Sequence, residues 1–158
     1  IRNLSHRLTP LIIEKYAFKK AFEDLVNTVY LSEKIKMQLV IVGFDNTERY
    51  SPAFLNDIYR IIQELLQNIL KHAGASEALL ELVEHEEQIT VMIEDNGIGI
   101  SENAAGNGLG LGNIRSRVAY LDGKMEISGK KENGTLVVIE FNTKQKMNAH
   151  AFTTDHSR

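Results

Sequence analysis

The chain has 158 residues, of which 43% are hydrophobic and 25% are charged, and its formal net charge is −3. These values are typical of one soluble domain with a sizeable core, and the charge gives no reason to expect nucleic acid or an anionic membrane as a partner. The sequence contains no cysteine, which excludes disulfides, thiolate metal sites and cysteine nucleophiles. It also contains no apolar stretch long enough to span a bilayer.

The first part of the chain predicts a helix end, a helix and a strand. Residues 1–9 are expected to end a helix, because Pro10 disfavours helix in the residue before it. Apolar residues gather on one face over 17–31 and predict an amphipathic helix. Apolar and polar residues then alternate from residue 35 to 41, which is the periodicity of a strand.

A long helix is predicted for residues 53–73. Ser51 is a suitable N-cap, and Pro52 fits the first turn. A wide apolar stripe then continues to residue 73, and Gly74 is expected to end the helix.

Strands and one further helix fill the rest of the chain. Strands are predicted at 77–84 and 88–95, a helix from about residue 113 to just before Gly123, and a closing hairpin from 124–128 and 135–141. Three helices with strands in adjacent pairs predict an α+β fold, a two-layer sandwich with the helices on one face of a mixed sheet.

Asp95 stands at the end of the strand at 88–95 and is followed at once by Gly97 and Gly99. A carboxylate in this place can accept hydrogen bonds from an amino group, and the glycines would let a flat ring approach the backbone. The alternative is an ordinary turn, for which Asp-Asn-Gly is also suited.

Glu64 and Asn68 are four residues apart and therefore share one face of the long helix, which Lys71 and His72 continue. The amide oxygen of Asn68 suits Mg²⁺, and Glu64 could orient a water or act as a base. Lys71 offers a mobile positive charge to an anion. A polar helix face in contact with solvent is the alternative.

Four alternating glycines lie between residues 106 and 112. They give an unhindered backbone whose amides can turn toward anions, and the helix expected to begin near Asn113 would favour phosphate at its N-terminus. The segment matches neither the P-loop nor the Rossmann fingerprint. Arg115 and Arg117 are expected near the phosphate end, where one of them could contact phosphate, and plain surface exposure is the alternative.

Together these three segments resemble the nucleotide site of the superfamily that joins gyrase, Hsp90-type chaperones, MutL and histidine kinases. Residues 64–68 resemble its N box, residues 95–99 its first glycine box, and residues 106–112 its second. Over residues 1–142, the chain most resembles the ATP-binding domain of a bacterial sensor histidine kinase. The short gap at 101–105 is similar to that of the short-lid subclass, which usually signals to helix-turn-helix response regulators.

The resemblance implies ATP and Mg²⁺ as cofactors, with Asn68 as the metal ligand and Glu64 and Asn68 as catalytic residues. It implies that Asp95 accepts from the exocyclic amine of adenine, which would favour ATP over GTP. Thr135 fits either an adenine contact through water or a plain strand residue. The nucleotide-binding residues expected from the resemblance are Asn68, Lys71, His72, Asp95, Gly97, Gly99, Gly106, Gly108, Leu109, Gly110, Leu111, Gly112 and Thr135.

The function implied is that of a histidine kinase domain, an enzyme that transfers the ATP γ-phosphoryl to a histidine for relay to a response regulator. The expected organisation is the end of a dimerisation hairpin at 1–12, the catalytic domain at 13–143 and a polar tail at 144–158. The hairpin would make the full-length protein a homodimer. Because the chain begins at Ile1, we expect it to be a cytoplasmic piece of a longer protein that could be anchored in a membrane elsewhere, with no membrane contact of its own.

His6 is not expected to be the acceptor histidine, because Arg7 follows it where the family normally has an acidic residue. The acceptor is instead expected upstream of Ile1. Two alternatives remain open: a protein-serine kinase of the anti-sigma-factor type, and a non-catalytic nucleotide-binding module that regulates a partner. A gyrase- or chaperone-type ATPase is disfavoured because the corresponding transducer regions are missing.

Overall fold

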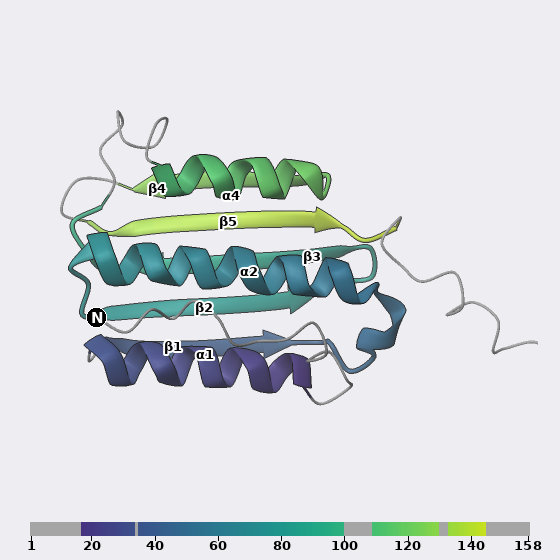
Figure 1. Ribbon diagram of the computed structural model, residues 1–158, viewed down its shortest axis with the longest axis horizontal. Helices are drawn as coiled ribbons and strands as arrows, with labels where there is room; N and C mark the ends of the chain where they lie inside the picture. Colours follow the sequence, from purple (N-terminus) through teal and green to yellow (C-terminus); the bar gives the residue numbers. More distant parts are fainter. Residues whose placement is uncertain (1–16, 34, 100–108, 130–132, 145–158) are drawn as a thin grey trace, which may run out of the picture.

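The computed structural model describes residues 17–33, 35–99, 109–129 and 133–144. The predicted hairpin end at 1–12 with His6, nearly all of the tail at 144–158, and Gly106 and Gly108 lie outside the described residues. The elements in chain order are α1 (Ala17–Glu33), β1 (Lys36–Val42), the 3₁₀ turn η1 (Thr47–Arg49), α2 (Pro52–Asn68), the π-helical turn η2 (Ile69–Ala73), β2 (Glu77–Glu84), β3 (Gln88–Asp95), α4 (Leu109–Tyr120), β4 (Gly123–Gly129) and β5 (Thr135–Asn142) (Figure 1).

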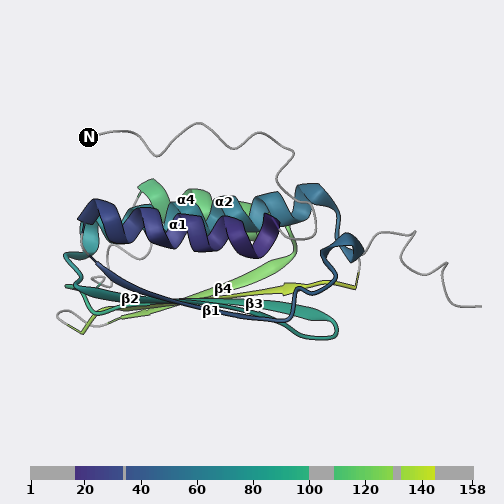
Figure 2. The same cartoon turned by 90° about the horizontal axis from the view of Figure 1, so that it is seen from below.

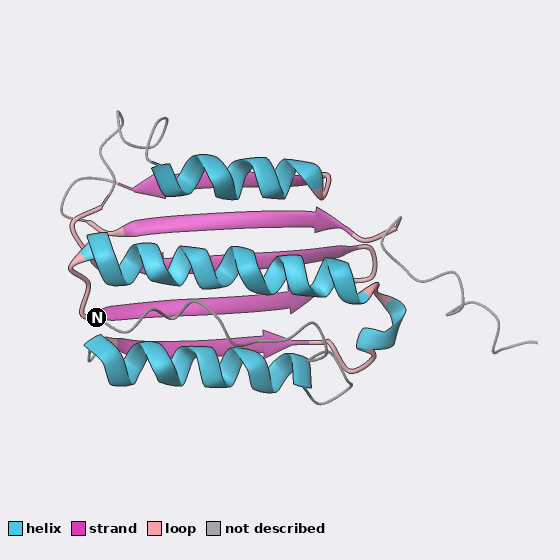
Figure 3. Ribbon diagram, viewed as in Figure 1, coloured by secondary structure: helices cyan, strands magenta, loops and turns pink. Residues whose placement is uncertain are grey.

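The strands form one five-stranded mixed sheet in the order β1-β2-β3-β5-β4. Strands β1 and β2 are parallel, and each of the other neighbouring pairs is antiparallel. A parallel pair needs a crossover connection, and α2 supplies it between β1 and β2. The three long helices lie together on one face of the sheet, as Figure 2 shows and as Figure 3 shows in the colours of secondary structure.

The core lies between the helices and the sheet. Helix α1 buries residues three or four positions apart, and β3 buries every second residue, as the helical and strand periods require. These residues are Phe18, Phe22, Leu25, Val26 and Val29 on α1, and Ile89, Val91 and Ile93 on β3. The predicted two-layer α+β sandwich with three helices on one face of a mixed sheet is confirmed.

Helix α2 begins as the sequence predicts, with Pro52 in its first turn and the Ser51 side chain accepting a hydrogen bond from the Phe54 N–H at 3.3 Å. At its other end the α-helix stops at Asn68 and widens into the π-helical turn η2, which Gly74 ends with a φ of 57°. The sequence predicts an unbroken helix there, because the apolar stripe continues through residue 73.

Helix α4 begins at Leu109, four residues before the predicted start near Asn113. The prediction was wrong because Gly110 and Gly112 were interpreted as part of an unhindered segment before the helix, whereas both lie in its first turn. Within the part of the chain that the structure describes, no helix combines the length and apolarity needed to cross a bilayer.

Candidate functional site

Asp95 is the last residue of β3, and its side chain is buried, with an exposed fraction of 7%. Its Oδ1 accepts a hydrogen bond from the Gly97 N–H at 2.8 Å. Its register partner on β5 is Thr135, for which an adenine contact through water and a plain strand position were both expected. Burial raises the pKa of the Asp95 carboxyl above its ordinary value, although hydrogen bonds from Gly97 and Thr135 act in the opposite direction. The carboxylate is thus held in place and largely dry, with capacity for a further donor.

Gly97 is required by close packing against the end of the π-helical turn η2. A Cβ at this position would lie 2.1 Å from the Ala73 carbonyl oxygen and 2.9 Å from Asp95 Oδ1. The next residue, Ile98, donates its N–H to the same Ala73 carbonyl at 2.8 Å. Gly97 also accepts from the Gly134 N–H at 2.9 Å, and Gly99 has a left-handed φ of 75°. The first glycine box therefore joins η2, β3 and β5 at one end of the sheet.

Asn96 fixes the same loop from the other side, a role that the sequence analysis did not assign. Its Oδ1 accepts from the Ser76 N–H at 2.9 Å and the Glu77 N–H at 3.0 Å, and its Nδ2 donates to the Ser76 hydroxyl at 2.9 Å. An asparagine between Asp95 and Gly97 was the available signal, since short amides often bond nearby backbone. Here the amide ties the loop to the start of β2 and thereby orients Asp95.

The N-box residues lie on the last turns of α2, away from its core-facing stripe. Glu64 and Asn68 are half-buried, whereas Lys71 and His72 are exposed on the π-helical turn η2. The end of this turn contacts the first glycine box through the Ala73 carbonyl. Asn68 and Asp95 therefore belong to segments that meet at the same end of the sheet, at the left of Figure 1.

The second glycine box is described only from Leu109 onward, and this part is the first turn of α4 rather than a loop. Leu111 is half-buried and packs against the core. A Cβ added to Gly110 would lie 3.0 Å from Asn68 Oδ1, whereas a Cβ added to Gly112 would meet nothing within 4 Å. The start of α4 therefore lies directly against the N-box asparagine.

Arg117 does not lie at the phosphate end, and that expectation was wrong. Its guanidinium lies 3.2 Å from Asp57 Oδ1, near the beginning of α2. The cause is the early start of α4 at Leu109, which puts Arg117 in the last turn of the helix, away from its N-terminus. Arg115 is exposed on the same helix.

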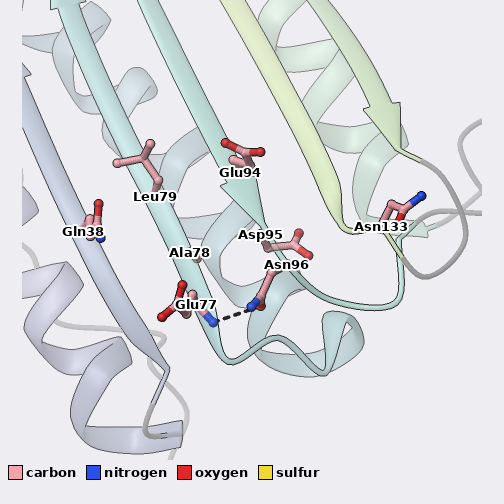
Figure 4. Close-up of a pocket in the computed structure, with 8 residues that line it drawn as sticks. All are labelled: Gln38, Glu77, Ala78, Leu79, Glu94, Asp95, Asn96 and Asn133. Atoms are coloured by element: carbon pink, nitrogen blue, oxygen red, sulfur yellow. Dashed lines mark hydrogen bonds between the residues drawn. The ribbon is translucent and has the colours of Figure 1, made fainter.

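A shallow cavity of about 270 Å³ lies at the end of the strands, and Figure 4 shows the residues that line it. Gln38, Leu79 and Glu94 come from the face of the sheet away from the helices, because each follows or precedes a core-facing position. Asp95 is the one predicted site residue among its lining residues. We therefore do not assign this cavity to the nucleotide, because the predicted residues on α2, η2 and α4 belong to the helical layer.

The metal-binding capacity of the described residues is small. Among them, no group of three or more histidine, aspartate or glutamate side chains is placed to hold a metal ion. Mg²⁺ does not need such a group, because it commonly keeps several waters and takes one or two protein oxygens together with substrate phosphates. The half-buried amide of Asn68 and the carboxylate of Glu64 one turn earlier fit this limited donor set.

Comparison with known proteins points to a single family. Residues 55–145, more than half of the chain, match the family model described as "Histidine kinase-, DNA gyrase B-, and HSP90-like ATPase". The sensor histidine kinase MctS of Rhizobium johnstonii is 29% identical over 143 residues, covering 88% of this chain and 31% of the relative. The sensor histidine kinase ComP of Bacillus subtilis is 30% identical over 146 residues, covering 88% of this chain and 18% of the relative. The chain thus spans less than a third of either relative.

Solved structures give the same fold. The histidine kinase domain from the Erythrobacter litoralis EL346 blue-light activated histidine kinase matches with a TM-score of 0.67 at 20% identity. The match covers 90% of this chain and 68% of that one. At this identity the likeness is one of fold.

Proposed function

Since this chain belongs to the family of histidine kinase-, DNA gyrase B- and HSP90-like ATPases, we propose that it is the ATP-binding catalytic domain of a sensor histidine kinase. In this proposal it presents the γ-phosphoryl of Mg²⁺-ATP to a histidine on a helical hairpin outside the chain. The observation that carries the proposal is that the end of α2, the loop after β3 and the start of α4 meet at one end of the sheet, through Ala73–Gly97 and Asn68–Gly110.

Asp95 recognises the adenine ring in this proposal. Its carboxylate accepts from the exocyclic amine, and Gly97, which donates its N–H to the same carboxylate, holds it in place. Guanine carries an oxygen where adenine carries this amine, so a buried acceptor would face another acceptor. A buried polar group left without its partner is costly, and this cost gives the preference for ATP.

Asn68 supplies one oxygen ligand to Mg²⁺, which when bound would neutralise phosphate charge. Glu64 lies one helical turn earlier and orients the attacking group or accepts its proton. Lys71 and His72 are exposed on η2, from which their side chains can reach toward phosphate as point charge and hydrogen-bond donor. The work of the domain is positioning and charge neutralisation, which account for most catalysis of phosphoryl transfer.

The partners follow from the same proposal. The acceptor hairpin belongs to the same protein upstream of this chain and makes it a homodimer, and a response regulator receives the phosphoryl group from it. The proposed location of the domain is the cytoplasm. These assignments rest on the family and on the sensor histidine kinases that the chain resembles.

The test is labelling with γ-radiolabelled ATP, with and without a separate polypeptide that carries the upstream hairpin. We expect no label on the chain alone and an acid-labile, base-stable phosphate on the hairpin when both are present. Asn68→Ala should abolish the labelling while thermal melts of the two proteins nearly coincide, because Asn68 is outside the core. Acid-stable phosphate would indicate a serine kinase, and ATP binding without any labelling would indicate a regulatory module.

A further inference from the structure

Two glycines occupy the first turn of α4, and only one of them has a packing reason. Glycine disfavours the helix interior relative to alanine, so each position invites alanine unless a side chain is excluded. A Cβ at Gly112 would meet nothing within 4 Å. At Gly110 it would lie 3.0 Å from Oδ1, 3.2 Å from Nδ2 and 3.5 Å from Cγ of Asn68. The whole amide group of Asn68 therefore lies against the bare backbone of α4.

We propose that Gly110 is a positioning residue that acts through Asn68. The missing side chain lets the first turn of α4 lie against the amide and hold it in one orientation. This inference rests on the proposed role of Asn68 as the Mg²⁺ ligand, because the orientation of the amide determines where its oxygen points. It also assigns Gly110 a steric role, in place of the anion-binding role expected from the glycine pattern.

We expect the side-chain amide of Asn68 to move when a methyl group is added at residue 110, while the backbone stays in place. The contact distances of 3.0 and 3.2 Å require a shift of only a few tenths of an ångström. The terminal torsion of asparagine is broad, so the amide can turn away at small energetic cost. Helix α4 is less free to move, because Ile114 and Val118 are buried in the core and Arg117 pairs with Asp57. Gly110→Ala should therefore fold and misorient Asn68.

The steric role and an anion-binding role make different predictions. Alanine keeps the backbone N–H that would bind an anion, so a backbone role survives Gly110→Ala. A steric role is lost in Gly110→Ala, because the added methyl group fills the space next to Asn68. Gly112→Ala is the matched control, since it makes the same chemical change two residues away in open space.

The experiment measures ATP affinity of the 158-residue chain by calorimetry, over a series of Mg²⁺ concentrations and in EDTA. For Gly110→Ala we expect the Mg²⁺ concentration at half effect to rise by about tenfold or more, with affinity in EDTA unchanged. Gly112 is itself among the predicted nucleotide-binding residues, so Gly112→Ala is compared in its Mg²⁺ dependence alone: the Mg²⁺ concentration at half effect should equal that of the wild type, and the variant should melt at a higher temperature. Equal Mg²⁺ dependence of the two variants would overturn the proposal.

A second readout needs neither metal nor nucleotide. The side-chain NH₂ signals of Asn68 in a ¹⁵N-correlated NMR spectrum can be assigned by their loss in Asn68→Ala. Gly110→Ala should shift these signals in the free protein, and Gly112→Ala should leave them in place. Unshifted signals in Gly110→Ala would contradict the steric contact itself.

The double variant Asn68→Ala/Gly110→Ala separates failure of this inference from failure of the proposed function. If Gly110 acts through Asn68, adding Gly110→Ala to Asn68→Ala changes nothing further, and it restores any melting temperature that Gly110→Ala alone has lost. If Gly110→Ala lowers the melting temperature and the double variant does not recover it, the inference is overturned. If Asn68→Ala leaves Mg²⁺ dependence intact, Asn68 is not the ligand and the proposed function fails, while the NMR shift still reports on Gly110.

Discussion

Two carboxylates mark the opposite ends of the sheet, Glu84 at the end of β2 and Asp95 at the end of the antiparallel strand β3. Both carboxylate oxygens of Glu84 accept hydrogen bonds within the protein. Oε1 accepts from the Tyr50 hydroxyl at 2.6 Å, and Oε2 accepts from the Phe44 N–H at 2.5 Å. Arg49 adds a charge at 3.8 Å from Oε1. Asp95 instead accepts hydrogen bonds from Gly97, in the loop that follows it, and from Thr135.

The surroundings of Glu84 show what a structural carboxylate does. It closes the connection between β1 and α2, in which Phe44 is buried with a left-handed φ of 60°. A Cβ at Gly43 would lie 2.6 Å from the Glu84 Cβ, so the connection runs directly against β2. Burial and the hydrogen bond to Glu84 raise the pKa of Tyr50 above its ordinary value, which keeps the hydroxyl a donor. Protein groups fill this end, whereas the Asp95 end retains capacity for an outside amine.

The largest effect on folding is expected from Glu84→Gln. Tyr50 and Phe44 donate to different oxygens of Glu84, and in glutamine one of these two positions is an NH₂ group that cannot accept. One of the two donors therefore loses its acceptor, at a cost of about 2–3 kcal/mol in the free energy of unfolding. Urea denaturation measures this, with Glu126→Gln on the exposed face of β4 as the control. ATP affinity should not change. Loss of ATP affinity in Glu84→Gln would erase the distinction between the two ends.

Asp95→Asn should show the opposite pattern, with a large loss of ATP affinity and a small change in the free energy of unfolding. Spoiling a hydrogen bond to a charged group is expected to weaken ATP binding by about 1–3 kcal/mol. The free energy of unfolding should change less, because burial already disfavours the charged carboxyl. Calorimetric titration and urea denaturation measure the two effects, and Glu94→Gln, on an exposed neighbouring residue, is the control. If Asp95→Asn loses much stability but its folded form binds ATP as tightly as the wild type, Asp95 serves the fold and does not bind the nucleotide.

A smaller effect is expected in the pH dependence of stability. The pKa of Asp95 is raised in the folded state, so its contribution to stability is present below the unfolded value near 3.8 and is lost as pH rises through the folded value. The stability of the wild type relative to Asp95→Asn should therefore fall as pH rises above about 3.8, by about 1.4 kcal/mol for each unit of pKa difference. Thermal melts of both proteins at each pH measure it. A difference that grows with pH would show that burial is not the dominant cause.

The smallest effect is expected from the pair of Arg117 and Asp57. The side chains are 39% and 25% exposed, so the pair should contribute about 0.5 kcal/mol to the free energy of unfolding. A double-mutant cycle with Arg117→Ala and Asp57→Ala measures the coupling. Neither variant should alter ATP affinity, because the pair lies away from Asn68. A marked loss of affinity in Arg117→Ala alone would return this residue to the phosphate end.

The sequence predicted the family and most of the fold because both depend on local patterns. The three motifs identified the family, which the family model confirms, and the periods of 2 and 3.6 placed the strands at 77–84 and 88–95 with the bounds that the structure has. The start of α4 was wrong because glycine propensity is local, whereas the contact of Gly110 with Asn68 is tertiary. The same error made the expected position of Arg117 wrong.

The roles of Asn96 and Glu84 could not be predicted for the same reason. Glu84 meets Phe44 and Tyr50 across more than 30 positions of sequence, and no pattern near residue 84 announces this. Asn96 binds the start of β2, 19 and 20 residues away. The roles assigned to the predicted nucleotide-binding residues remain predictions.

The central claim is that the Asp95 end of the sheet is an adenine site, and nucleobase selectivity tests it most directly. Calorimetric titrations of the wild-type chain with ATP and with GTP, each with Mg²⁺, compare two ligands with the same triphosphate. We expect ATP to bind at least about tenfold more tightly, which corresponds to about 1.4 kcal/mol from the hydrogen bond to Asp95. Equal affinities for ATP and GTP would contradict the assignment of Asp95 as the residue that recognises adenine.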